Sequence, residues 1–130
     1  MSAISNFLEL EILDHVFNVG AYTAPSIYCA LFSTTPTESA FGTEVSDANY
    51  ARQRVVTWDT AVTGATENSS LIQWASAAAS FGVCGIALMD GSTAACTTNM
   101  LWYGPLSASK AVGVGDVFEI AASALDVTLD

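Results

Sequence analysis

Hydrophobic and polar positions repeat with a helical period near the N-terminus. At about 100° per residue, the polar side chains between residues 10 and 19 fall on one arc, and apolar side chains occupy the other side. These polar residues are Glu11, Asp14, His15 and Asn18. Ser2 or Ser5 is placed to cap the start, and Gly20 is expected to end the helix as a C′ glycine. The pattern predicts one amphipathic helix over residues 4–19, whose apolar face packs on its own sheet or on a neighbour.

Beyond residue 20 the pattern changes to strands separated by turn-rich loops. Residues 25–33 are apolar on both faces, as in a buried strand. Residues 80–90 are typical of a central strand, in which Gly82 and Gly85 mark a bulge or a close backbone approach. Further strand patterns cover residues 50–58, 71–75, 100–106 and 125–129. One helix followed by about seven strands predicts a mainly β fold, an antiparallel β-sandwich of jelly-roll type over residues 25–130, in a single domain.

The charge balance of the chain excludes several kinds of partner. Thirteen acidic and three basic residues give a formal net charge of −10, and only 12% of the 130 residues are charged. Binding to nucleic acid or to an anionic membrane surface needs clustered lysine and arginine, which the sequence lacks. No run of about 18 apolar residues is present, so we expect no transmembrane helix. The N-terminus lacks the marks of a signal peptide, which favours assembly inside a cell.

The sequence presents no complete set of catalytic, cofactor-binding or metal-binding residues. His15 is the single histidine, and its i, i+4 neighbour Glu11 adds only one more ligand, so a solvated helix face is favoured over a metal site. The three cysteines, Cys29, Cys84 and Cys96, form no CxxC pair and are expected to be small buried hydrophobic residues. We therefore predict that the protein is not an enzyme and needs no cofactor and no metal.

The stretch "SKAVGVGDVF" at residues 109–118 contains the residue types of a phosphate-binding loop in the wrong order. A Walker-type loop places its lysine after the glycines and before a helix, whereas Lys110 precedes Gly113 and Gly115, and a strand pattern follows. The third glycine of a dinucleotide-binding fingerprint is also missing. We predict a turn between strands, in which Gly113 or Gly115 has a positive φ or forms a bulge and Asp116 bonds to backbone amides.

Two further sets of side chains are compatible with binding. Arg52 and Arg54 share a strand face and suit an acidic partner, but an exposed edge strand or ion pairs with the surplus acids are favoured. Four aromatic residues suit a sugar-stacking platform, although such residues more often belong to a core or a subunit interface. They are Trp58, Trp74, Trp102 and Tyr103.

Four segments that together span nearly the whole chain carry a resemblance to a known family. They are "ILDHVFNVGAYTAPSIYCALFSTTPT" at 12–37, "YARQRVVTW" at 50–58, "FGVCGIALMD" at 81–90 and "LWYGPLSASKAVGVGDVFEIAASALDVTLD" at 101–130. The chain resembles a family of small tailed-phage virion proteins, commonly described as tail fibre proteins. The resemblance implies a structural role in the virion, a β-rich fold and assembly as a homo-oligomer, most often a trimer. It implies no catalytic residues.

The resemblance leaves the position in the virion open. Because the chain is short and acidic and has no repetitive shaft, we predict a capsid decoration or cement protein that binds the major capsid protein on the outer shell. The alternative is a tail fibre or tail-tip adhesin subunit, whose loops 34–49 and 59–69 would carry host recognition. A small hydrolase that uses Asp116 and Glu119 is a third hypothesis, which we disfavour because no motif marks these carboxylates as a pair.

Overall fold

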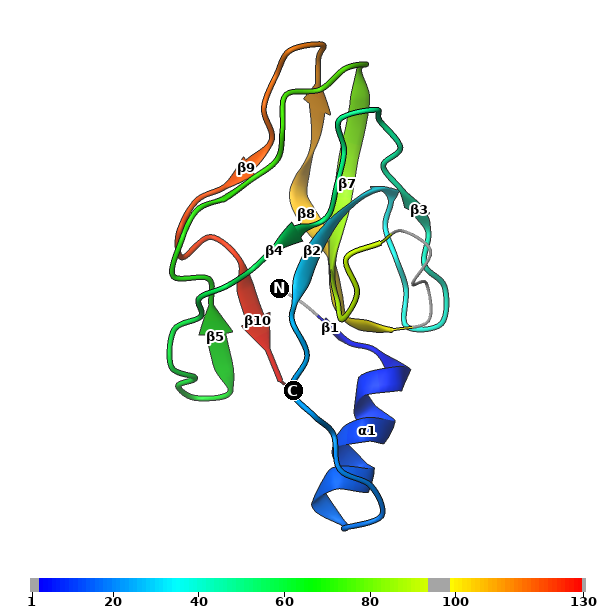
Figure 1. Ribbon diagram of the computed structural model, residues 1–130, viewed down its shortest axis with the longest axis vertical. Coiled ribbons are helices and arrows are strands. Elements are labelled where there is room, and N and C mark those ends of the chain that lie inside the picture. Colours follow the sequence, from blue (N-terminus) through cyan, green and yellow to red (C-terminus); the bar gives the residue numbers. More distant parts are fainter. Residues whose placement is uncertain (1–2, 94–98, 130) are drawn as a thin grey trace.

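A computed structural model describes residues 3–93 and 99–129 of the protein. Over these residues it contains one helix near the N-terminus and otherwise β-strands, and all the strand pairs are antiparallel (Figure 1). The predicted mainly β, antiparallel fold with an N-terminal helix is confirmed. The elements are β1 (Ala3–Ile4), α1 (Asn6–Val16), β2 (Tyr28–Thr34), β3 (Thr43–Glu44), β4 (Gln53–Arg54), β5 (Ala65–Glu67), β6 (Ile72–Gln73), β7 (Phe81–Met89), β8 (Met100–Val112), β9 (Glu119–Ile120) and β10 (Asp126–Thr128).

The larger sheet is built around two long, largely apolar strands, β2 and β7. Its strand order is β1-β8-β7-β2-β3, and β4 also pairs with β2. Because side chains alternate across a strand, Cys29 and Leu31 of β2 enter one core cluster while Ala30 and Phe32 enter another. The prediction that this segment is buried on both faces is therefore confirmed.

The main core lies between this sheet and two small ladders, β5–β10 and β6–β9. Trp74 is buried here and meets Phe118 edge to face, with 5.5 Å between the ring centroids. Leu125 and Val127 are buried as their alternation predicted, whereas Leu129 at the end of that pattern is exposed. The second layer thus consists of two separate two-stranded ladders that pack over the larger sheet.

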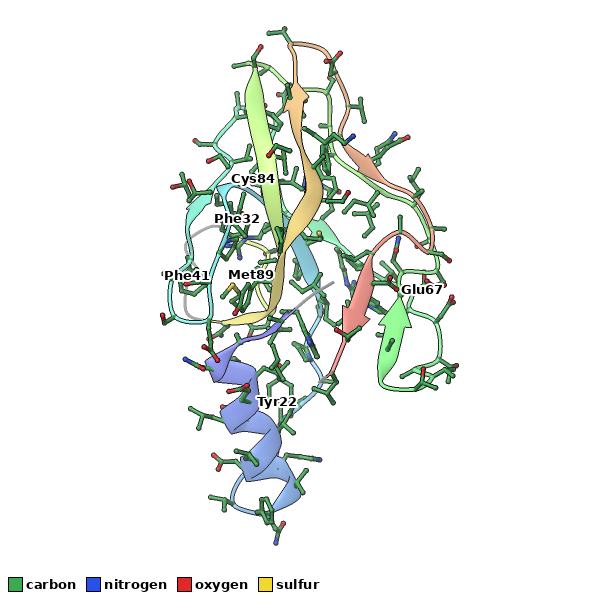
Figure 2. The ribbon with its side chains drawn as sticks, turned by 180° about the vertical axis from the view of Figure 1, so that it is seen from behind. Tyr22, Phe32, Phe41, Glu67, Cys84 and Met89 are labelled. Carbon is green, nitrogen blue, oxygen red and sulfur yellow. The ribbon has the colours of Figure 1, made fainter. Side chains whose placement is uncertain are left out.

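A second, smaller core covers the opposite face of the larger sheet. Figure 2 shows Phe32, Phe41 and Met89 gathered there. Ala30, Ala87 and Met100 complete the buried set, and Tyr103 packs against it. Because both faces of β2 and β7 are covered, these strands tolerate their nearly continuous apolar sequences.

The structure shows which residues cap the two ends of α1. The side-chain oxygen of Ser5 accepts a hydrogen bond from the N–H of Leu8, so Ser5 is the N-cap. At the other end, Asn18 takes the left-handed conformation at φ 60°, and the N–H groups of Asn18 and Val19 donate to the carbonyls of His15 and Asp14. This is a Schellman motif. The expectation that Gly20 is the C′ residue was therefore wrong. Asn18, two residues earlier, takes the left-handed conformation that ends the helix.

Three strand boundaries differ from the sequence pattern. The pattern over residues 50–58 contains only the short strand β4, with an isolated bridge from Trp58 to Asn68. The pattern at 71–75 reduces to β6. The returning strand predicted at 100–106 continues as β8 to Val112, because it follows β7 past a bulge between Val83 and Gly85. β8 therefore includes Ser109–Val112, the first part of the stretch predicted to form a turn.

At Gly85 the backbone of β7 lies close to β8 and to the loop that follows β2. A Cβ atom at this residue would lie 3.2 Å from the carbonyl oxygen of Gly104 and 3.2 Å from Thr35. Nothing lies within 4 Å of the corresponding position at Gly82. The predicted bulge and close approach are thus confirmed for Gly85. At Gly82 there is room for a larger side chain, so no close approach requires glycine there.

Candidate interaction surfaces

The most unusual surface of the protein is an apolar stripe on α1 and the residues that follow it. Figure 1 shows α1 extending from one end of the molecule, away from the β layers. Phe17 is 72% exposed and Leu13 is 53% exposed. The full stripe is Leu10, Leu13, Val16, Phe17 and Val19. Leu10, Leu13 and Phe17 follow the i, i+3, i+7 spacing of one helix side. The predicted apolar face therefore exists, and its own sheet does not cover it.

α1 is held to the β body by its first turn. Leu8 is the residue of α1 that is buried, and the hydroxyl of Ser5 donates to the carbonyl of Met100 on β8. The N–H of Ser5 donates to the carbonyl of Leu101 at 2.9 Å. These contacts fix the direction in which the helix leaves the sheet. Among the described residues, no helix has the length and apolar character that crossing a membrane requires.

His15 has a local structural contact. Its Nδ1 atom accepts a hydrogen bond from the N–H of Tyr22 at 3.2 Å, which ties the exit segment back against the helix. Figure 2 shows Tyr22 beside α1. Burial raises the pKa of the Tyr22 hydroxyl, with smaller contributions from Asp90 and Glu11. In the described part of the chain, no three His, Cys, Asp or Glu side chains gather as a metal site requires.

A second apolar surface is a hollow beside the β5–β10 ladder, which we call the Trp58–Trp102 hollow. Its volume is about 300 Å³. It is lined by Ile27, Trp58, Ala61, Gly64, Ala65, Thr66, Leu88, Trp102, Val127, Thr128 and Leu129, none of which is charged. The indole N–H of Trp102 donates to the carbonyl of Thr128 at 3.2 Å. The indole nitrogen of Trp58 is buried and has no hydrogen-bond partner among residues 3–93 and 99–129.

The four aromatic residues considered as a sugar platform do not form one. Trp74 is in the main core, and Trp58 and Trp102 border it from the hollow. Tyr103 packs on the opposite face of the sheet, since neighbouring residues of a strand point in opposite directions. Core packing therefore accounts for Trp74 and Tyr103, and the two remaining indoles form an apolar surface.

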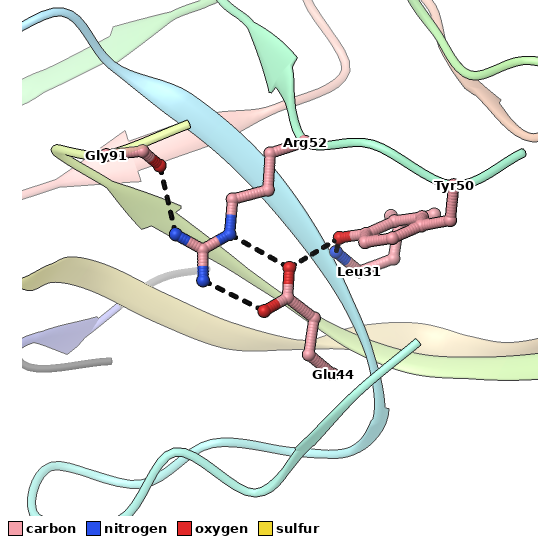
Figure 3. Close-up of polar contacts among 5 residues, drawn as sticks. All are labelled: Leu31, Glu44, Tyr50, Arg52 and Gly91. Carbon is pink, nitrogen blue, oxygen red and sulfur yellow. Dashed lines mark hydrogen bonds and ion pairs between the residues drawn. The ribbon is translucent and has the colours of Figure 1, made fainter. Parts of the chain in front are cut away.

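A buried polar cluster joins Glu44, Tyr50 and Arg52 (Figure 3). The Tyr50 hydroxyl donates to Oε1 of Glu44 at 2.8 Å and accepts from the N–H of Leu31 at 3.0 Å. Nη1 of Arg52 donates to the carbonyl of Gly91 at 2.9 Å. Burial, together with the Glu44 carboxylate, raises the pKa of Tyr50 far above its ordinary value. The cluster links β3, the segment before β4 and the loop after β7.

This cluster corrects the expectation for the two arginines. Arg52 is buried and paired with Glu44, so the ion-pair alternative is right for this residue, while Arg54 is exposed on β4. The two side chains do not form one exposed face. The sequence did not mark Glu44 as the partner, because it lies in a region predicted to be a loop and only the fold brings it to Arg52.

The stretch at residues 109–118 ends in a tight turn. The N–H of Asp116 donates to the carbonyl of Gly113 at 3.0 Å, and Gly115 has φ 82° at the third position, as in a type II turn. The carboxylate of Asp116 accepts from the N–H of Gly113 at 2.9 Å. The predicted positive φ at Gly115 and the local bond of Asp116 are confirmed. The strand that follows begins only at Glu119.

The remaining candidate residues are dispersed. Glu119 lies on β9, where its carboxylate accepts from the side-chain amide of Gln73 at 3.2 Å, while the Asp116 carboxylate bonds within its own turn. Cys29 is completely buried, as predicted, and Cys84 is half-buried with its sulfur 3.4 Å from the Thr35 hydroxyl. Cys96 lies outside the described residues.

Comparison with known protein families decides the class of the protein. The sequence model of the family described as podophage GP4 fiber I protein gp80 matches residues 3–128, which is nearly the whole chain. The chain belongs to this family. Among curated proteins, none matches the chain significantly.

Membership of this fiber I family places the protein in the virion of a tailed phage, as a structural component that associates with other virion proteins. The resemblance to small tailed-phage virion proteins is thereby confirmed. The matched region contains the apolar stripe of α1 and the buried Glu44–Arg52 pair.

Proposed function

We propose that the protein is a non-enzymatic subunit of a phage tail fibre or a similar virion appendage, and that it works as a homo-oligomer, most simply a trimer. In this proposal residues 1–130 act as one structural domain without cofactor, metal or catalytic residues. The family description as a fiber protein supports the tail position.

The observation that carries the proposal is the exposed apolar stripe on α1. Each large apolar side chain contributes roughly 1.5–3 kcal/mol when it is moved from water into a packed environment. Leaving five such side chains in water at one end of the molecule forgoes that stabilisation. An exposed apolar patch of this kind is typical of a protein–protein contact surface. The subunit is thus suited to an assembly in which another chain covers α1.

Capsid decoration is the second candidate function, and the compactness of the body favours it. The described residues form a β body with a single protruding helix and contain no repetitive shaft. A decoration protein needs only a compact domain with one adhesive surface, which this arrangement supplies. The partner would then be the major capsid protein, whereas a fibre subunit would contact tail proteins.

Antibody labelling of purified phage particles, read by electron microscopy, separates the two functions. We expect label at the tail, with the protein present in particles purified by density gradient. Label distributed over the head would support the decoration function and contradict the fibre function. If the protein is missing from the particles, both functions fail. Antibody against the major capsid protein provides the control for head labelling.

A further inference from the structure

We propose that the apolar stripe on α1 docks into an apolar groove of a different virion protein, and that lysine or arginine side chains border this groove. The inference rests on the proposed role as a virion subunit and names the chemistry of the partner at α1. It is carried by the charges around the stripe and by the spacing of its apolar side chains.

Carboxylates lie along the stripe. Glu9 precedes Leu13 by four residues on α1, and Asp14 follows Leu10 by the same spacing. Side chains with this spacing are neighbours on a helix surface. Glu9 and Asp14 are both exposed, as are the two leucines. A protein that covers the stripe therefore also meets two negative charges beside it.

The two carboxylates beside the stripe are not neutralised by the rest of the chain. In the part of the chain that the structure describes, neither Glu9 nor Asp14 forms an ion pair with lysine or arginine. Arg52 is buried against Glu44. Lys110 is near the end of β8, which Figure 1 shows at the opposite end of the molecule from α1. The compensating positive charge has to come from a partner.

Charge disfavours a second copy as the occupant and favours a basic surface. Of the three lysines and arginines, Arg52 is buried, and Arg54 and Lys110 lie on different strands. A second copy, with its 13 acidic residues, would add surplus carboxylates at the stripe and increase the repulsion. An anionic membrane surface would do the same. A groove bordered by lysine or arginine instead turns both carboxylates into attractive contacts, which speed association and fix the register.

The shape of the stripe matches the helix-in-groove mode of recognition. In this mode an amphipathic helix inserts apolar anchors at i, i+3 and i+7 into a groove. Leu10, Leu13 and Phe17 have this spacing and span about 10 Å along the helix. Because α1 extends away from the β layers, a groove can enclose this face (Figure 1). The complementary groove is thus about two helical turns long, with an apolar floor and a basic rim.

A photo-crosslinker at the centre of the stripe identifies the occupant in intact phage particles. Phe17 is replaced by p-benzoylphenylalanine, the purified particles are irradiated, and the crosslinked peptides are read by mass spectrometry. We expect crosslinks to a virion protein of different sequence, at a segment that contains lysine or arginine. The same crosslinker at Val114, an exposed residue in the turn after β8, is the control and should not reach that segment.

Removing the charges beside the stripe tests the basic rim. Glu9→Gln with Asp14→Asn keeps the size of both side chains. In phage that carries this pair, we expect about 10-fold less of the protein per particle than in wild-type phage, since two charge–charge contacts are lost. Glu38→Gln with Asp59→Asn removes two exposed carboxylates outside the stripe and should leave the content unchanged. Circular dichroism of the purified variants verifies that each is folded.

Several results would overturn the inference. They are a crosslink to a second copy of this chain, a crosslink to a segment without lysine or arginine, no crosslink from position 17, and equal particle contents for the two double variants. Each of these leaves the proposed role in the virion standing, because the protein is then still a component of the particle. Absence of the wild-type protein from purified particles would overturn both.

Discussion

Glu44 and Arg52 form a two-pronged ion pair inside the protein. Nε and Nη2 of Arg52 donate to the two carboxylate oxygens of Glu44 at 2.9 Å and 2.8 Å (Figure 3). The Arg52 side chain is 2% exposed and that of Glu44 is 14% exposed. The pair, extended by Tyr50 and the Gly91 carbonyl, joins parts of the chain that are far apart in sequence.

Arg52→Met should destabilise the fold strongly, because it leaves the Glu44 carboxylate largely buried without its cation. Removing one partner of a buried ion pair costs about 3–5 kcal/mol of the free energy of unfolding. Urea unfolding measures the change. Arg54→Met is the matched control, because this neighbouring arginine is exposed, and it should change stability by less than about 0.5 kcal/mol. Equal effects of the two substitutions would show that the buried pair contributes nothing.

Cys29 should make the stability fall at alkaline pH. Burial raises the pKa of its thiol from 9.0 to about 12. Above pH 9 the unfolded chain loses this proton while the folded chain retains it. The contribution of the Cys29 thiol to the free energy of unfolding is therefore complete below pH 9. It is lost as the pH rises toward 12, by about 1.4 kcal/mol per pH unit.

The Cys29→Ala variant should show a shallower decline of unfolding free energy between pH 9 and 12. Its stability at neutral pH also falls because the truncation leaves a small cavity. Val83→Ala, another truncation in the same core, should lower stability while preserving the wild-type slope. Urea unfolding at several pH values provides both quantities. An unchanged slope in Cys29→Ala would contradict the prediction.

Asp47 should protect the protein against acid. Its carboxylate accepts hydrogen bonds from the N–H groups of Ala78, Ala79 and Asn49, and these bonds, that of Ala78 first, lower its pKa. Because the pKa of Asp47 is lower in the folded state than in the unfolded chain, its carboxylate adds to the free energy of unfolding above the ordinary pKa of 3.8. This added stability is lost as the pH falls through the pKa of the folded state.

Asp47→Asn should lower the thermal midpoint at pH 7 and reduce its decline between pH 5 and 2. It should also speed hydrogen exchange at the amides of Ala78 and Ala79, since these lose a charged acceptor. Asp59→Asn, which replaces an exposed carboxylate, serves as the control. Unchanged exchange at both amides in Asp47→Asn would show that the carboxylate does not hold this segment.

Gly85→Ala should destabilise the larger sheet, whereas Gly82→Ala on the same strand should not. The new methyl group at position 85 meets backbone atoms of Gly104 and Thr35 at 3.2 Å, and such overpacking costs about 1–3 kcal/mol. Position 82 offers open space. Thermal unfolding of both variants measures the difference, and equal midpoints would contradict the close approach.

Much of the fold was predictable because neighbouring residues specify it. Ser5 caps α1 through the amide of Leu8, only three residues away, and Gly115 completes a four-residue turn closed by Asp116. The strand at β7 follows from a continuous apolar run. Asn18 shows the limit of such reasoning. Both Asn18 and Gly20 can adopt the left-handed conformation that ends a helix, and the sequence alone does not say which of them does so. In the structure Asn18 adopts it, and the hydrogen bonds to the carbonyls of His15 and Asp14 close the helix there.

The sequence by itself therefore determined the mainly β class, the single helix and its apolar face, since these depend on periodicity over a few residues. Only the tertiary structure decided where the side chains go. Arg52 is buried because the fold brings Glu44 and Gly91 to it, and Phe17 is exposed because the ties at Ser5 direct α1 away from the sheet. Burial and exposure depend on contacts between residues distant in sequence, which local periodicity does not encode.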